Sequence, residues 1–164
     1  MALELDTAGD PALEPVEPGY KSVLRVRMSV FWLALWAIGA VADQVFLQLT
    51  PVAGLPAFGI PILGLVAIVT APQRIYRRLR YKLTERLLQV VRGWVFHVDT
   101  VVPLVRVQHI DVTRGPLEKM FGVSTLVVHT AGTHNSIVTL PGLAPERAAQ
   151  IRDIIREHVR TDFA

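Results

Sequence analysis

The chain has 164 residues, contains no cysteine and carries a formal net charge of +3, with a mean hydropathy of +0.40. This length accommodates one modest domain with accessory segments, and the missing cysteines exclude disulfides, thiolate zinc sites and cysteine nucleophiles. The positive hydropathy is concentrated in one third of the chain, which indicates membrane segments.

The charges are distributed unevenly around that apolar third. Residues 1–20 hold acidic side chains and no basic one, so we expect a disordered acidic tail there. Basic residues gather on both sides of the apolar third, at Lys21, Arg25 and Arg27 and again between Arg74 and Arg92. Such basic flanks are typical of the cytoplasmic ends of membrane spans.

Two apolar segments, at about 28–49 and 52–71, are each long enough to cross a hydrocarbon core of about 30 Å as a helix. With their flanks they form a predicted transmembrane hairpin over residues 21–73. No Lys or Arg occurs between Met28 and Gln73. The positive-inside rule therefore predicts a multi-pass protein of the inner (cytoplasmic) cell membrane, with both termini in the cytoplasm.

Polar and helix-breaking residues lie near the predicted turn of this hairpin. Asp43 is placed where its carboxylate can reach the far interface, and a role as a proton or ion relay is the less favoured alternative. Pro56, Gly59 and Pro61 lie in the first half of the second segment, so we expect that half to be kinked or partly unwound.

A basic linker at 74–80 follows the second segment and leads into the next domain. The simplest interpretation is a topology signal in the lipid headgroups; selective binding of anionic lipid, at about 1 kcal/mol per basic group, is the alternative. The candidate residues for both roles are Arg74, Arg77, Arg78, Arg80 and Lys82.

Residues 81–164 change to short alternating runs rich in Val, Thr and aromatic residues, which is typical of an antiparallel β domain. We expect a break at Pro141-Gly142, and after it a helix at about 145–160 with an apolar stripe that includes Ile151, Ile154 and Ile155 and packs over the mouth of the β domain. The expected strands are 81–84, 87–92, 94–100, 103–113, 123–130 and 136–140, with a helical turn at 117–121.

The apolar alternation slips within the strand that Pro103 is expected to open. Val105 and Val107 share one parity, whereas Ile110 and Val112 share the other. A β-bulge at Gln108-His109 would bring all four aliphatic side chains to the core face.

Residues capable of chemistry are present without a recognisable site. The histidines lack the spacing of a metal motif, and although His97, His109 and His129 could converge near Asp99 or Asp111, we expect ordinary surface positions for them. Serines without a nucleophile elbow give hydrolase chemistry no support. We therefore expect no catalytic, cofactor or metal site, and no nucleic-acid binding, because topology already accounts for the basic residues.

Arg106 and Gln108 are polar residues in an apolar strand. We interpret them as structural, tied to neighbouring carbonyls or to the loop at Glu118. The alternative is a contact surface for a partner or a lipid headgroup.

The order of segments resembles the bacterial pleckstrin-homology-like (bacterial PH domain) membrane proteins of the YdbS-like family, from about Tyr20 onward. The residues that carry this resemblance are Tyr81-x-Leu83-Thr84, Val91-x-Gly93, Val102-Pro103-x-x-Arg106-Val107-Gln108-x-Ile110, Phe121-Gly122-Val123, Thr130-Ala131-Gly132 and Leu140-Pro141-Gly142-Leu143.

The resemblance implies a PH-like split β-barrel of about six or seven antiparallel strands with a C-terminal amphipathic helix, in a non-catalytic interaction or assembly protein. The expected partners are the lipid bilayer and either another membrane protein, such as a larger PH-domain relative, or further copies of this chain in a homo-oligomer. Two alternatives are a subunit of an exporter or envelope-protection complex and an anionic-lipid headgroup sensor.

Overall fold

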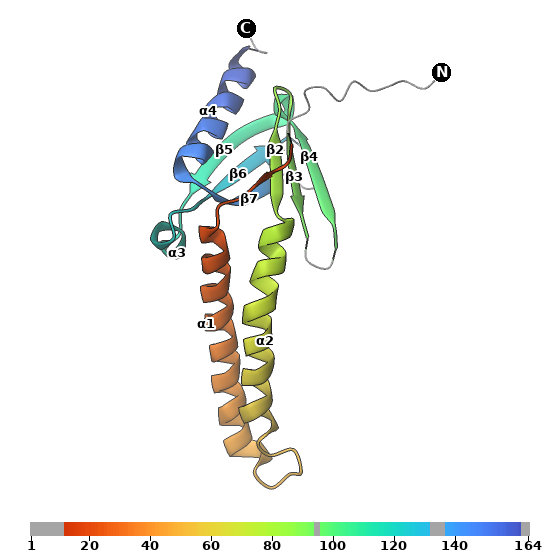
Figure 1. The fold of residues 1–164 in the computed structure, drawn as a ribbon, viewed down its shortest axis with the longest axis vertical. Helices are drawn as coiled ribbons and strands as arrows, with labels where there is room; N and C mark the ends of the chain where they lie inside the picture. Colours follow the sequence, from red (N-terminus) through yellow and green to blue (C-terminus); the bar gives the residue numbers. More distant parts are fainter. Residues whose placement is uncertain (1–11, 94–95, 132–136, 162–164) are drawn as a thin grey trace, which may run out of the picture.

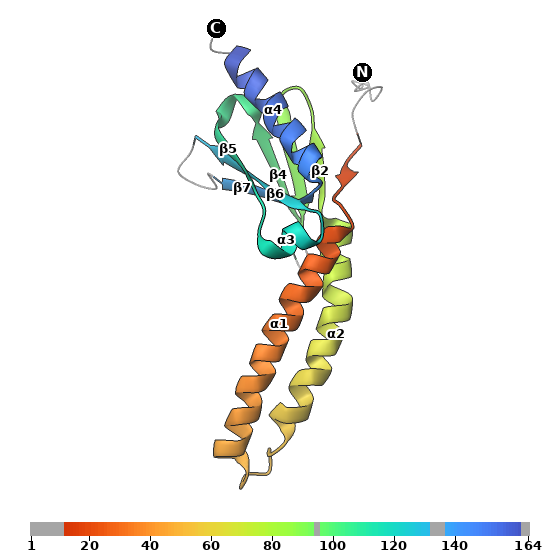
Figure 2. The same cartoon turned by 90° about the vertical axis from the view of Figure 1, so that its left-hand side faces the viewer.

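Two long helices carry a small β domain at one end (Figures 1 and 2). The computed structural model describes residues 12–93, 96–131 and 137–161. Helices α1 (Gly19–Ala42) and α2 (Leu55–Arg78) lie side by side, and α1 continues into a π-helical turn at Asp43–Leu47. Both helices are long and apolar enough to cross a membrane.

Small residues let the two helices approach each other closely. Gly64 of α2 faces Trp32 of α1, and a Cβ on Gly64 would lie 3.1 Å from the indole ring. The indole N–H of Trp36 donates a hydrogen bond to the carbonyl oxygen of Ala57 at 3.0 Å. Close packing and interhelical hydrogen bonds stabilise helix pairs in lipid, so these contacts between α1 and α2 stabilise the hairpin.

The turn between the helices is closed by Asp43. Its buried carboxylate accepts a hydrogen bond from the backbone N–H of Gly54 at 2.8 Å, and Gly54 has a left-handed φ of +84° that other residues disfavour. The expected unwinding of the second segment is confined to its start. Pro56 lies in the first turn of α2, where no N–H is required, and the helix continues through Pro61.

The segment before α1 is not a disordered tail throughout, which corrects the expectation for residues 1–20. Residues 1–11 lie outside the described part of the chain, but Glu14–Pro15 form strand β1 and pair with the β domain. Val16 and Tyr20 are buried in the core, and α1 begins at Gly19, well before the predicted span. Burial of apolar side chains outweighs the acidic composition there.

The basic linker expected at 74–80 is not a separate segment either. Helix α2 runs without interruption through Arg78, and strand β2 begins at Arg80. The single residue between them, Leu79, is buried in the core. A linker of one buried residue fixes the helix hairpin directly to the β domain.

The β domain consists of two antiparallel sheets. β1 pairs with β2 (Arg80–Leu83), followed by β3 (Leu87–Arg92) and β4 (Val98–Pro103), in a four-stranded sheet. The second sheet contains β5 (Val107–Thr113), β6 (Ser124–Thr130) and β7 (Ile137–Leu143) in that order. Among the described strands no pairing joins one sheet to the other, so closure into the expected split barrel stays a prediction.

The predicted bulge in β5 is confirmed. Val107 pairs with Thr130 and His109 with His129, so the register shifts at Gln108. The strand boundary before it was wrong: Pro103 ends β4 opposite Leu87, and a 3-10 turn over Leu104–Arg106 separates β4 from β5. Val105 therefore lies in a turn with 65% of its surface exposed, and does not reach the core.

The expected break at Pro141-Gly142 is a second bulge. Ser124 pairs with Leu143 whereas Thr125 pairs with Pro141, which leaves Gly142 as the extra residue in β7. A left-handed φ of +82° at Gly142 allows the strand to continue to Leu143.

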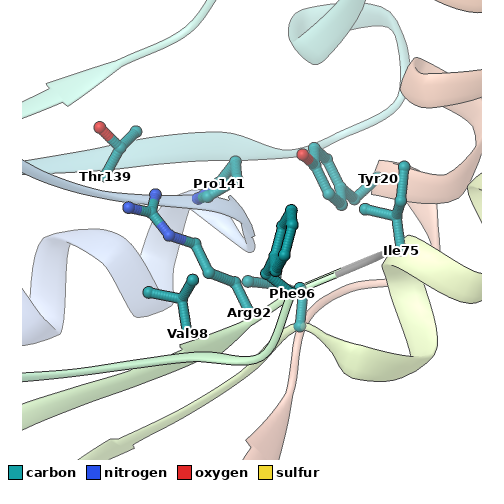
Figure 3. A pocket seen from close by; sticks show the side chains of 9 residues that line it. Tyr20, Ile75, Arg92, Phe96, Val98, Thr139 and Pro141 are labelled. Carbon is teal, nitrogen blue, oxygen red and sulfur yellow. The ribbon is translucent and has the colours of Figure 1, made fainter.

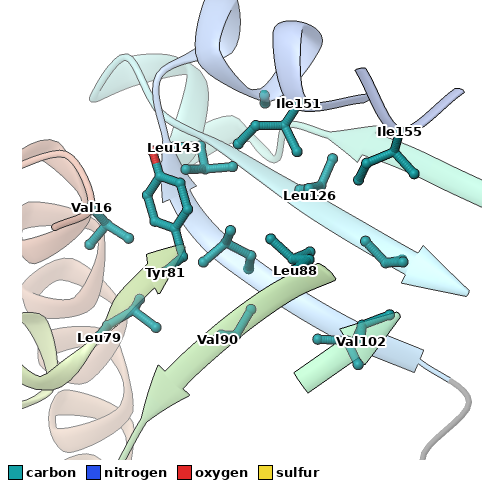
Figure 4. Packing of buried hydrophobic residues seen from close by; sticks show 14 of the residues in the cluster. Val16, Leu79, Tyr81, Leu88, Val90, Val102, Leu126, Leu143, Ile151 and Ile155 are labelled. Atoms are coloured by element: carbon teal, nitrogen blue, oxygen red, sulfur yellow. The ribbon is translucent and has the colours of Figure 1, made fainter. Parts of the chain in front are cut away.

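The hydrophobic core fills the space between the sheets (Figure 4). Leu88 and Val90 of β3 lie opposite Leu126 of β6, and helix α4 (Pro145–Thr161) adds Ile151 and Ile155, which are fully buried. Helix α4 packs against β5, β6 and the turn before β5, as its apolar stripe predicted. Ile154 differs from that prediction, with 42% of its surface exposed.

Candidate functional site at the junction of helices and sheets

The short helix α3 (Pro116–Met120) connects the β domain to α1 through Glu118. This carboxylate is buried and accepts hydrogen bonds from the N–H of Gly115 at 2.7 Å and from the hydroxyl of Thr125 at 2.8 Å. One of its oxygens lies 3.8 Å from the guanidinium of Arg27 in α1. Glu118 thus links α3, β6 and the first helix.

The bulge in β7 provides a second contact between the β domain and the start of α1. The N–H of Glu17 donates a hydrogen bond to the carbonyl oxygen of Gly142 at 2.7 Å. A Cβ on Gly142 would lie 2.7 Å from the Cβ of Tyr20, so only glycine fits where β7 meets the first turn of α1.

A third attachment joins β1, β2 and α4. Arg147 donates hydrogen bonds from one guanidinium nitrogen to both carboxylate oxygens of Glu14 at 3.0 Å, and from another to the hydroxyl of Tyr81 at 3.4 Å. Burial raises the pKa of Tyr81, the hydrogen bond from Arg147 opposes that rise, and Glu14 adds to it. The phenol therefore stays protonated at neutral pH.

The five basic candidates do not form one surface. Arg74, Arg77 and Arg78 lie on the last turns of α2, and Arg80 is the first residue of β2. Lys82 is the correction: it lies in β2 with only 9% of its surface exposed, so it does not belong to a headgroup-facing cluster. Lys21 joins the set from α1, with its ammonium 5.2 Å from the centre of the Tyr76 ring.

The candidate residues of the family motifs have separate positions. Pro103 ends β4, Gly122 follows α3 with a φ of +65°, and Pro141 and Gly142 form the bulge in β7, while Gly132 lies outside the described residues. Arg106 and Gln108 are exposed. Their interpretation as structural residues tied to neighbouring carbonyls or to the loop at Glu118 stays a prediction. The carbonyl oxygen of Arg106 does accept a hydrogen bond from Ala131 at 2.9 Å.

Two histidines converge across β5 and β6, as the sequence allowed. His109 and His129 place their Nε2 atoms 2.9 Å and 3.6 Å from the two carboxylate oxygens of Asp111. Their ring centres are 5.8 Å apart. Among the described residues, no three or more His, Asp or Glu side chains are arranged so that they could hold a metal ion.

A pocket of about 570 Å³ lies where the ends of both helices meet the two sheets (Figure 3). Tyr20 of α1 and Ile75 of α2 form its wall on the helix side, and Pro141 of β7 faces Phe96 from the β3–β4 connection and Val98 at the start of β4. Leu79, Gly93 and Thr139 also line it, and Arg92 is the one charged group among its described lining residues. This volume is in the range of about 300–1,000 Å³ for small-molecule sites.

The outer edge of β4 is an accessible sheet edge. Within residues 12–93, 96–131 and 137–161, no strand pairs with that edge. Val101 projects from β4 with 52% of its surface exposed, on the face opposite the buried Val102. An unpaired edge with exposed apolar residues is a template for another strand.

Sequence reasoning named Gly142 and Tyr81 in the family motifs, but it did not predict the contacts that Glu118, Arg92 and Arg147 make in this junction. For Glu118 a local signal existed. Gly115 is the N-cap residue of α3, and a Glu at the third position of a helix is typical of a capping box. For Arg92 and Arg147 there was none. Arg92 is one of many basic residues in its region, and the partners of Arg147 are 66 and 133 positions away in the chain.

Comparison with known proteins agrees with this architecture. The family model described as "Bacterial PH domain" matches residues 29–159. The "UPF0699 transmembrane protein YdbS" of Bacillus subtilis (strain 168) is 33% identical over 97 residues, which is 59% of this chain and 59% of that protein. The match thus covers less than two thirds of that relative. No solved structure matches the chain.

Proposed function

The chain belongs to the bacterial PH domain family, and from this premise we propose that it is a membrane-anchored, non-catalytic interaction module that docks a protein partner. Both termini and the β domain lie on the cytoplasmic side of the cell membrane. The basic residues support this orientation, because Lys21, Arg74 and Arg77 all lie at the domain end of the helices and none occurs between Met28 and Gln73.

The orientation is tested by labelling, since the chain has no cysteine of its own. Leu49, in the exposed turn of the hairpin, and Arg86, in the exposed turn between β2 and β3, are each changed to Cys. A membrane-impermeant maleimide added to intact cells should label Leu49→Cys and spare Arg86→Cys until the cells are opened. The opposite pattern would overturn the proposed topology.

The unpaired edge of β4 carries the proposal of partner docking. Main-chain N–H and C=O groups on such an edge provide affinity for an incoming strand, and exposed side chains such as Val101 provide specificity. The partner we propose is a larger membrane protein with PH-like domains of its own. A strand from such a domain supplies a matching edge, and a second copy of this chain is the other possible source of one.

The docking test is a purification of the tagged full-length protein from its native membrane in mild detergent. We expect a larger PH-domain protein to co-purify with the wild type and to be lost with Val101→Glu, because a charge on an edge strand opposes pairing. Ile154→Glu is the matched control, since Ile154 is also exposed but lies on α4. Equal recovery with both variants would refute docking at β4, and a strictly monomeric protein without any partner would refute the proposed function.

The alternative role as a subunit of an exporter or envelope-protection complex places the partner against the helix hairpin. Gly59 discriminates the two, because a Cβ on Gly59 meets no atom within 4 Å and therefore points away from the hairpin. Gly59→Leu should leave complex formation unchanged if β4 docks the partner and disrupt it if the hairpin does. Gly64→Leu is unsuitable, since Gly64 packs against Trp32 and the variant would disturb the hairpin itself.

A further inference from the structure

We propose that the pocket at the junction binds one anionic phospholipid from the adjacent membrane leaflet. In this arrangement the phosphate pairs with Arg92, and the glycerol and first acyl carbons lie against Tyr20, Ile75 and Phe96. The site differs from the basic residues on the last turns of α2, which attract any anionic surface without enclosing a ligand.

The depth of the pocket places it beside lipid headgroups. Twenty helical residues span a hydrocarbon core of about 30 Å, so counting from the start of α2 at Leu55 the core ends near Arg74. Ile75 and Leu79 then lie within about 8 Å of that boundary. Twenty residues counted back from Leu47, at the end of the π-helical turn, put the boundary on the first helix near Met28, with Tyr20 about 12 Å beyond it. The helix-side wall of the pocket therefore begins at the level of the headgroups.

The lining matches the two ends of a phospholipid. Toward the helices the walls are apolar, formed by Ile75, Leu79 and the ring of Phe96, which keeps 79% of its surface exposed. Toward the sheets the guanidinium of Arg92 points at Thr139 and away from Ile75 (Figure 3). In a lipid lifted slightly from the leaflet, the phosphate lies farthest from the hydrocarbon and the acyl chains lie nearest to it. The phosphate would then be level with Arg92, and the first acyl carbons level with Ile75, Leu79 and Phe96.

The charge in the pocket selects for an anionic headgroup. No ion pair or hydrogen bond within the described parts of the chain engages the guanidinium of Arg92. A guanidinium binds a phosphate through two parallel hydrogen bonds, whereas it repels the ammonium group of a zwitterionic lipid. With one cation and mostly apolar walls among its described lining residues, the pocket suits one phosphodiester on an alkyl chain better than a soluble polyphosphate.

Native mass spectrometry of the full-length protein in detergent tests this proposal. Phosphatidylglycerol or phosphatidylcholine is added in steps, and the lipid-bound fraction is measured. We expect the wild type to prefer phosphatidylglycerol, and Arg92→Gln to weaken its binding by about fivefold or more through loss of a charge-assisted pair. Arg86→Gln removes the same charge at the opposite end of β3 and should bind as the wild type does.

Two further variants separate binding in the pocket from binding to the basic residues of α2. Val98→Trp fills the pocket from β4 and should also weaken binding, while Arg77→Gln alters only the basic set on α2 and should not. Equal loss with Arg86→Gln, or loss with Arg77→Gln but not with Arg92→Gln, would overturn the proposal. Unchanged lipid binding by Arg92→Gln together with loss of the protein partner would also overturn it, and would assign the pocket to that partner.

Discussion

Replacing Gly142 with alanine tests how the β domain is attached to the first membrane helix. Gly142 has a φ of +82°, and a left-handed conformation costs a residue with a side chain about 1–2 kcal/mol. The new methyl group would also lie 2.7 Å from the Cβ of Tyr20, which is too close for a contact between carbons. Relieving such overpacking costs about 1–3 kcal/mol. We therefore expect Gly142→Ala to lower the free energy of unfolding by about 2–5 kcal/mol.

The matched control is Gly122→Ala. Gly122 has a similar φ of +65°, but a Cβ there meets no atom within 4 Å. It should therefore lose only the conformational part, about 1–2 kcal/mol. Both variants are compared with the wild type by urea unfolding in detergent, monitored by tryptophan fluorescence. If Gly142→Ala loses no more stability than Gly122→Ala, the close contact between β7 and α1 does not exist as described.

Three further predictions concern other parts of the junction and the hairpin. Glu118→Ala should lower the free energy of unfolding by about 2–3 kcal/mol, because buried donors lose a charged acceptor, and a loss below about 1 kcal/mol in urea would contradict this. Burial raises the pKa of Tyr81, so the folded state holds the phenol proton more tightly and stability should be lost as the pH rises above about 10. Thermal melts across that range should show a flatter loss for Tyr81→Phe, and an unchanged slope would contradict the assignment. Asp43→Ala should lower the free energy of unfolding by about 1–2 kcal/mol, because the N–H of Gly54 loses its acceptor. Asp43→Asn keeps an acceptor oxygen and should lose less stability. Equal losses for the two variants in urea unfolding would argue against the bond to Gly54.

Local patterns in the sequence were sufficient for the secondary structure of most of the chain. Hydropathy located both membrane helices, and alternating runs located most strands, because each signal depends on residues within one element. Even the bulge at Gln108 was predicted, since a slip in parity has few other solutions in a strand. The helix at Pro145–Thr161 followed from its apolar stripe in the same way.

Boundaries at proline and glycine were less predictable. Pro103 ends a strand where it was expected to open one, and Gly142 forms a bulge where a break was expected. The residue types announce a change of backbone direction, but which strand the chain pairs with afterwards depends on the neighbouring sheet.

The sequence by itself determined a two-helix hairpin, a β domain and a closing helix, because hydrophobic periodicity is local. Only the tertiary structure decided that β1 pairs with β2, that Lys82 is buried, and that Arg92 faces a pocket with Tyr20 and Ile75. These features depend on contacts between segments far apart in the chain. At β1, for example, burial of Val16 and Tyr20 in the core outweighs the disorder that the acidic composition of the segment favours.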